Sequence, residues 1–81
     1  MKDIYKRKRM TRAEIGGALY TLDHYLPGWE FFVNDGGSYG IMAPDSEGIR
    51  CTYANAAPTK QHAMVMAAIN VNHGLAARGE V

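Results

Sequence analysis

The sequence has 81 residues, of which 47% are hydrophobic and 21% are charged. A chain of this length makes one domain, and its composition excludes a disordered, collagen-like or mucin-like protein. Its single cysteine, Cys51, cannot form an internal disulfide, so we expect a soluble protein of the cytoplasm.

The charges are distributed unevenly, although the net charge is only +1. The first twelve residues hold six of the nine basic residues and one acidic residue, which gives this segment +5 and leaves −4 for the rest. We therefore expect a basic N-terminal arm over residues 1–10 and a single compact α+β domain over residues 11–81. The arm lacks the apolar stretch of a secretory signal, and we expect no membrane segment.

A first helix is predicted over residues 12–26. Thr11 and Glu14 fit the capping box, in which a Thr hydroxyl and a Glu carboxylate satisfy backbone N–H groups at a helix start. Pro27 and Gly28 then supply a stop. Between these signals, an apolar stripe at helical spacing consists of Ile15, Ala18, Leu19, Leu22 and Leu26.

Three strands are predicted next, because the apolar period changes to two. The expected strands are Trp29–Asn34, Ser38–Ala43 and Ile49–Tyr53, with turns at Asp35–Gly37 and Pro44–Gly48. The first loop must hold three or five residues if both flanking strands are to present their apolar residues on one face. That inner face would hold Trp29, Phe31, Val33, Tyr39, Ile41, Ala43, Ile49, Cys51 and Tyr53.

A loop over Ala54–Pro58 is expected to lead into a second helix. Thr59 is a suitable N-cap, and the helix either ends at Gly74 or frays toward Arg78. Its apolar stripe consists of Met64, Ala67, Ala68, Val71 and Leu75. The predicted fold class is therefore α+β, a three-stranded antiparallel meander with two helices on one face and the order α-β-β-β-α.

No motif predicts catalysis. Cys51 falls on the expected inner face, where a free cysteine behaves as a small buried hydrophobe. His62 and His73 would lie about 16 Å apart along one helix, too far to bind the same metal ion. We therefore expect no enzymatic activity, no metal site and no cofactor.

The last helix carries the strongest signal for binding, because no charged residue occurs between Gln61 and Ala77. A helix that is apolar all round is normally buried on both sides. We expect the face opposite its stripe to meet a second copy of the chain, as a homodimer, or a larger protein or ribonucleoprotein complex. That face holds His62, Val65, Met66, Ile69 and His73. The alternative is that the basic arm or the C-terminal tail covers it.

The first helix has a weaker signal of the same kind. Gly17, Tyr20 and His24 lie opposite its leucine stripe, and a flat surface of small residues beside a tyrosine suits a contact. Two glycines in a helix interior also cost roughly 1 kcal/mol each relative to alanine. The pattern therefore predicts either a partner surface or a locally weak helix.

The basic arm predicts a different class of partner. Its cations could neutralise phosphates and bind nucleic acid without sequence preference, and they extend into the first helix. The candidate residues are Lys6, Arg7, Lys8, Arg9 and Arg12. The alternative is a solvated terminus without a partner.

The order α-β-β-β-α is also that of the double-stranded-RNA-binding domain, and the segment Thr59–Ala63 with Ala67 and Ala68 resembles the start of that family's last helix. The resemblance implies binding of duplex RNA through a lysine cluster at that helix start. Here only Lys60 stands in that cluster, and Met64 takes the place of a second basic residue.

These observations favour a small non-enzymatic interaction protein that acts as a regulator, adaptor or inhibitor of a larger partner. Accessory proteins of mobile elements that inhibit a host complex belong to this class. The alternative function is nucleic-acid binding through the arm. If the last helix docks a partner, Ile69→Asp should abolish binding and leave the monomer folded.

Overall fold

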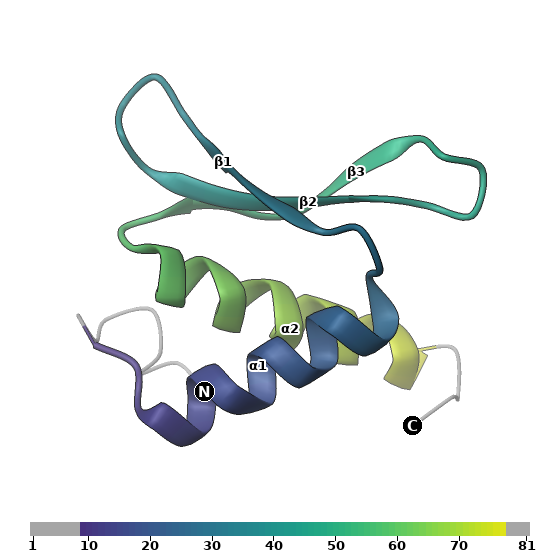
Figure 1. Ribbon diagram of the computed structural model, residues 1–81, viewed down its shortest axis with the longest axis horizontal. Coiled ribbons are helices and arrows are strands. Elements are labelled where there is room, and N and C mark those ends of the chain that lie inside the picture. The colour runs from purple at the N-terminus through teal and green to yellow at the C-terminus, as the bar shows by residue number, and fades with distance from the viewer. Residues whose placement is uncertain (1–8, 78–81) are drawn as a thin grey trace.

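Two helices and three strands follow one another in the predicted order in the computed structural model, which describes residues 9–77 (Figure 1). The α-β-β-β-α prediction is therefore confirmed. The elements are α1 (Arg12–Tyr25), β1 (Glu30–Val33), β2 (Tyr39–Pro44), β3 (Arg50–Ala57) and α2 (Lys60–Ala77).

Helix α1 begins with the predicted capping box. The Thr11 hydroxyl accepts the backbone N–H of Glu14 at 3.1 Å, and the Glu14 carboxylate accepts the backbone N–H of Thr11 at 2.8 Å. The helix ends at Tyr25, one residue before the predicted end, and the N–H of Leu26 closes the last turn on the carbonyl of Leu22. A Thr or Ser cap of this kind contributes about 1 kcal/mol to helix stability.

The three strands form one antiparallel sheet in the order β1-β2-β3. Residues 34–38 separate β1 from β2, so the loop has five residues, one of the two predicted lengths. Asn34 donates its backbone N–H to the carbonyl of Ser38, and Gly37 has a φ of +89°, a conformation that favours glycine. Phe31 consequently lies opposite Ile41, on the face predicted to be buried.

Strand β3 differs from the prediction at both of its ends. Ile49 is 59% exposed and belongs to the preceding turn, where the Asp45 carboxylate accepts its backbone N–H. The strand continues through Ala57, into the segment predicted as a loop. Two register shifts opposite β2 allow this continuation, and Ala56 has a φ of +63° there. Such bulges add residues that an alternating pattern does not show.

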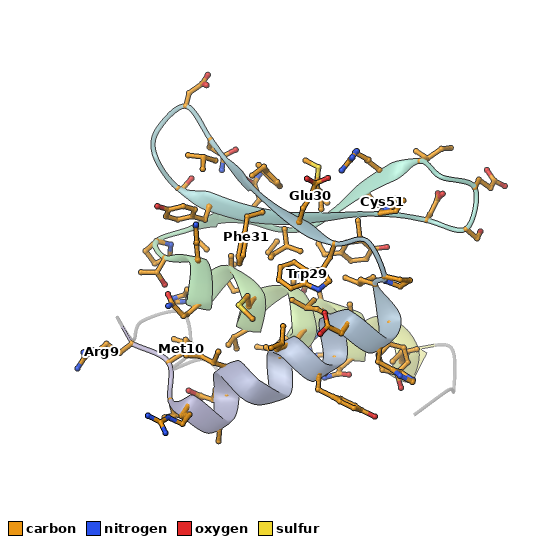
Figure 2. All side chains as sticks on the ribbon, viewed as in Figure 1. Arg9, Met10, Trp29, Glu30, Phe31 and Cys51 are labelled. Carbon is orange, nitrogen blue, oxygen red and sulfur yellow. The ribbon has the colours of Figure 1, made fainter. Side chains whose placement is uncertain are left out.

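Both helices lie on one side of the sheet, as predicted, but they contact it unequally (Figure 1). Helix α2 packs against β2 and β3, and α1 packs along α2. Trp29 joins α1 to the sheet, because its indole N–H donates to the Asp23 carboxylate at 2.8 Å and its ring meets the Phe31 ring edge-on. In Figure 2 both rings lie on the helix side of the sheet.

The core lies where α2 meets the sheet and α1. The predicted stripe of α2 is buried in full, as Met64, Ala67, Ala68, Val71 and Leu75. Leu22 and Ile41, from α1 and β2, are completely buried beside it. The capped start of α2 is also as predicted, since the Thr59 hydroxyl accepts the backbone N–H of His62 at 3.1 Å. The helix passes Gly74 and reaches Ala77, and Arg78 lies outside the described residues.

Candidate functional site

The face of α2 predicted to dock a partner is largely covered. His62 is 1% exposed and Val65 is 6% exposed, Met66 and Ile69 are half-buried, and His73 is exposed. Helix α1 packs along α2 in addition to the sheet, so this short chain covers a second side of the helix by itself. Of the five residues of the predicted face, only His73 is exposed.

His62 illustrates why this face is not a ready binding surface. Its imidazole lies in the interior, and its Nδ1 atom has no hydrogen-bond partner among the described residues. A buried group cannot meet a partner unless the fold opens. Within residues 9–77, no three His, Cys, Asp or Glu side chains gather in a way that could hold a metal ion.

The predicted residues of α1 occupy a more open surface. Gly17, Tyr20 and His24 are all exposed, and the Tyr20 side chain is 69% exposed. The rings of Tyr20 and His24 stack at 5.7 Å with an angle of 5° between their planes, and His24 meets Tyr25 edge-on at 4.5 Å. We call these three side chains, Tyr20, His24 and Tyr25, the aromatic ridge.

The glycines of α1 leave space beside the ridge. A Cβ atom built on Gly16 or on Gly17 would have no neighbour within 4 Å beyond its own helix. Leu19, on the flank of the same helix, is 42% exposed. Gly16 and Gly17 therefore leave the backbone of α1 uncovered beside the aromatic ridge.

A hollow of about 270 Å³ lies at the end of the ridge, and we call it the Tyr25 hollow after the residue it shares with the ridge. It is formed where the end of α1 meets β3 and the C-terminal half of α2. Its lining consists of Tyr25, Leu26, Tyr53, Asn70, Val71, Gly74 and Leu75. Neither Tyr25 nor this hollow was predicted, because helical spacing describes the faces of one helix at a time.

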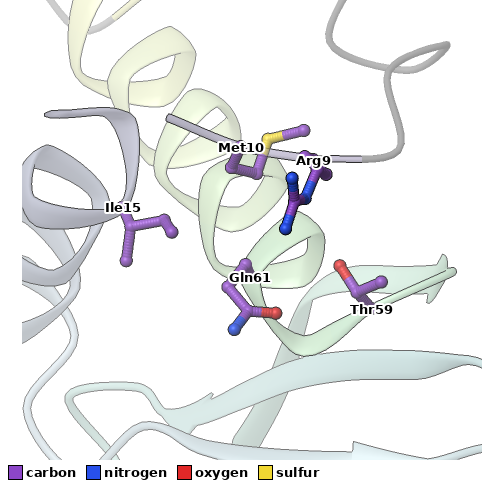
Figure 3. Close-up of a pocket in the computed structure, with 5 residues that line it drawn as sticks. All are labelled: Arg9, Met10, Ile15, Thr59 and Gln61. Carbon is purple, nitrogen blue, oxygen red and sulfur yellow. The ribbon is translucent and has the colours of Figure 1, made fainter. Parts of the chain in front are cut away.

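A second hollow, of about 300 Å³, lies at the opposite end of α2 (Figure 3). It is lined by Arg9 and Met10 from the segment that enters α1, by Ile15, and by Thr59 and Gln61 at the start of α2. Arg9 and Arg12 are exposed, and neither makes an ion pair with another described residue. Lys6, Arg7 and Lys8 of the predicted arm lie outside the described residues.

The outer face of the sheet carries its own side-chain pairs. Arg50 pairs with Glu30 across β2, where the Met42 sulfur also contacts the guanidinium at 3.3 Å, and Figure 2 shows Glu30 on the side away from the helices. Such exposed ion pairs contribute little to stability. Cys51 is half-buried rather than fully buried, and its Sγ lies 3.6 Å from the carbonyl oxygen of Ile49.

No protein-family model, curated protein or solved structure matches this chain. Within residues 9–77, neither helix has the length and apolar character needed to cross a membrane.

Proposed function

We propose that this protein is a non-enzymatic interaction module that docks on a larger protein or ribonucleoprotein through the outer surface of α1. The observation that carries the proposal is the aromatic ridge. Three of the five exposed large hydrophobic side chains in the described part of the chain belong to α1, namely Leu19, Tyr20 and Tyr25.

The chemistry of this surface supports docking over solvation. Tyrosine is enriched among the residues that dominate protein interfaces, because its ring buries a large area and its hydroxyl keeps a polar contact. The rings of Tyr20 and His24 already stack on each other, so little side-chain freedom would be lost on binding. Gly16 and Gly17 let a partner approach the backbone of α1 closely.

A regulator, adaptor or inhibitor would need no more than such a surface. An accessory protein of a mobile element that occupies the surface of a host complex is one such inhibitor, and we place this chain in that class as a proposal.

The test is affinity capture from the source cell with the wild type, Tyr20→Asp and Val33→Asp, each with and without nuclease. Tyr20 and Val33 are similarly exposed, at 69% and 62%, but Val33 lies on β1, away from the ridge. We expect one partner to be held by the wild type and by Val33→Asp and to be lost by Tyr20→Asp. Equal capture by all three proteins would contradict the proposal.

Light scattering on the purified protein separates a homodimer from a hetero-complex. If the partner is a second copy, the wild type should have twice the monomer mass and Tyr20→Asp should have the monomer mass.

A second candidate function is nucleic-acid binding, which the exposed cations at the start of α1 favour. Arg9 borders the hollow at the start of α2 (Figure 3). The first turn of this helix holds no acidic residue, and the first N–H groups of a helix have no partner within it. A phosphate there would meet Arg9 and the positive end of the helix dipole.

Removal of residues 1–10 tests this second function. The deletion should lower the affinity for RNA or DNA and flatten its dependence on salt, measured by fluorescence anisotropy. The absence of binding by the wild type at low salt would exclude it.

A further inference from the structure

The Tyr25 hollow has a size and a lining that point to one kind of occupant. Pockets for drug-sized ligands range from about 300 to 1,000 Å³, so a hollow of about 270 Å³ suits a single side chain. Two phenol rings, Tyr25 and Tyr53, form part of its wall, and the buried side chains of Leu26, Val71 and Leu75 form another part. None of the described residues that line it is charged.

One polar group in this wall has a fixed orientation. The Asn70 side chain donates from Nδ2 to the backbone carbonyl of Tyr53 at 2.6 Å. Because that partner can only accept, the amide nitrogen must face it, and the Asn70 Oδ1 atom is left to accept a hydrogen bond from elsewhere. No described residue donates to this oxygen, and because Asn70 is exposed the oxygen can bind water in the free protein.

Gly74 is one of the residues that line the hollow. It lies in the interior of α2, where glycine costs roughly 1 kcal/mol relative to alanine, and it lines the hollow directly. Because Gly74 lines the hollow, we expect a larger side chain at this position to narrow it.

We propose that the Tyr25 hollow receives a tryptophan or tyrosine side chain of the protein partner. An aromatic ring matches the two phenol rings and the aliphatic wall, and the N–H or O–H at its edge can replace water as the donor to Asn70 Oδ1. The hollow continues the aromatic ridge through Tyr25, so a partner that covers α1 can place an anchor there. That this side chain belongs to a protein partner rests on the proposed function.

The hollow can be tested without the partner by titrating the labelled protein with indole and recording amide resonances by NMR. We expect saturable shifts at Tyr53, Asn70 and Gly74. The probe 1-methylindole lacks the donor and should bind about fivefold more weakly, since one hydrogen bond contributes about 1 kcal/mol. Cyclohexanol, which lacks the aromatic ring, should give smaller shifts at the same concentration.

Filling the hollow supplies the second arm of the test. Gly74→Leu should weaken indole binding at least tenfold, and Gly74→Ala should weaken it less while raising the helix content. Gly36→Leu is the matched control, because Gly36 faces open space in the loop between β1 and β2, and it should bind indole as the wild type does. Circular dichroism establishes that each variant is folded, and Gly74→Ala carries the test if Gly74→Leu does not fold.

The outcomes separate this inference from the proposed function. Indole shifts that do not saturate, that lie elsewhere, or that persist unchanged in the folded Gly74 variants would overturn the anchor site. A partner that is lost by Tyr20→Asp but retained by Gly74→Leu would leave the docking surface in place and overturn the anchor. A positive indole titration with no captured partner would instead overturn the proposed function.

Discussion

The contact between Phe32 and Gly40 shows how a single missing side chain helps to shape this sheet. The two residues lie directly opposite each other on β1 and β2, and the Phe32 ring occupies the space where a side chain on Gly40 would stand. A Cβ atom on Gly40 would also lie 2.6 Å from the backbone oxygen of Ala54 on β3. Glycine normally weakens a strand interior, and an aromatic ring that packs over it compensates for part of this loss.

Gly40→Ala should therefore destabilise the protein by about 1–3 kcal/mol, because the new methyl group must displace both a ring and a backbone carbonyl. The measurement is the urea midpoint at an unchanged slope. Truncating Phe32 in the same chain should not restore stability, since the Ala54 carbonyl remains in place. Gly16→Ala, at an open helical position, should instead raise stability by about 0.5–1 kcal/mol. Equal midpoints for the two alanine variants would contradict this account.

At the scale of elements, short sequence patterns predicted the structural features that depend on residues close together in the chain, such as a helix start or a loop length. Thr11 and Glu14 specify the start of α1 because their bonds span only three residues. The loop length followed from parity, because side chains alternate between the two faces of a strand. The extension of β3 to Ala57 could not be predicted, since its two register shifts and the positive φ of Ala56 arise from pairing with β2.

The candidate site shows the same difference between features that depend on one element and features that depend on how several elements pack. Helical spacing correctly grouped Gly17, Tyr20 and His24 on an exposed face, but it also grouped buried His62 with exposed His73. Periodicity identifies which residues share a face and gives no information about what covers that face. The Tyr25 hollow could not be predicted for a related reason, because its walls come from three elements that are distant in sequence.

The burial of α2 changes the expected result for Ile69→Asp. Ile69 is half-buried and packs against the core, so a carboxylate there should destabilise the fold by about 1–3 kcal/mol and would not act as a clean binding mutation. His73→Asp, one turn further along the same helix and exposed, should stay within about 0.5 kcal/mol of the wild type. Thermal unfolding followed by circular dichroism compares the two. An Ile69→Asp protein as stable as His73→Asp would show that this part of α2 is open after all.

At the scale of the whole molecule, stability depends on α2, because this helix contacts both α1 and the sheet. A domain of this size is only marginally stable, with a free energy of unfolding on the order of 5–10 kcal/mol. Loss of the contact between α1 and α2 should therefore destabilise the whole domain and should not detach α1 alone.

Leu22→Ala tests this cooperativity. Leu22 of α1 is completely buried, and the truncation should cost about 2–5 kcal/mol, a large part of the total stability. Trp29 reports on the junction of α1 with the sheet, since its indole bonds to Asp23 and its ring meets Phe31, while far-ultraviolet circular dichroism is dominated by the helices. Urea transitions from the two signals should coincide in the wild type and should shift by the same amount in the variant. If the dichroism changed at lower urea than the fluorescence, α1 would be detaching from a sheet that remains folded, and α2 would not couple the two.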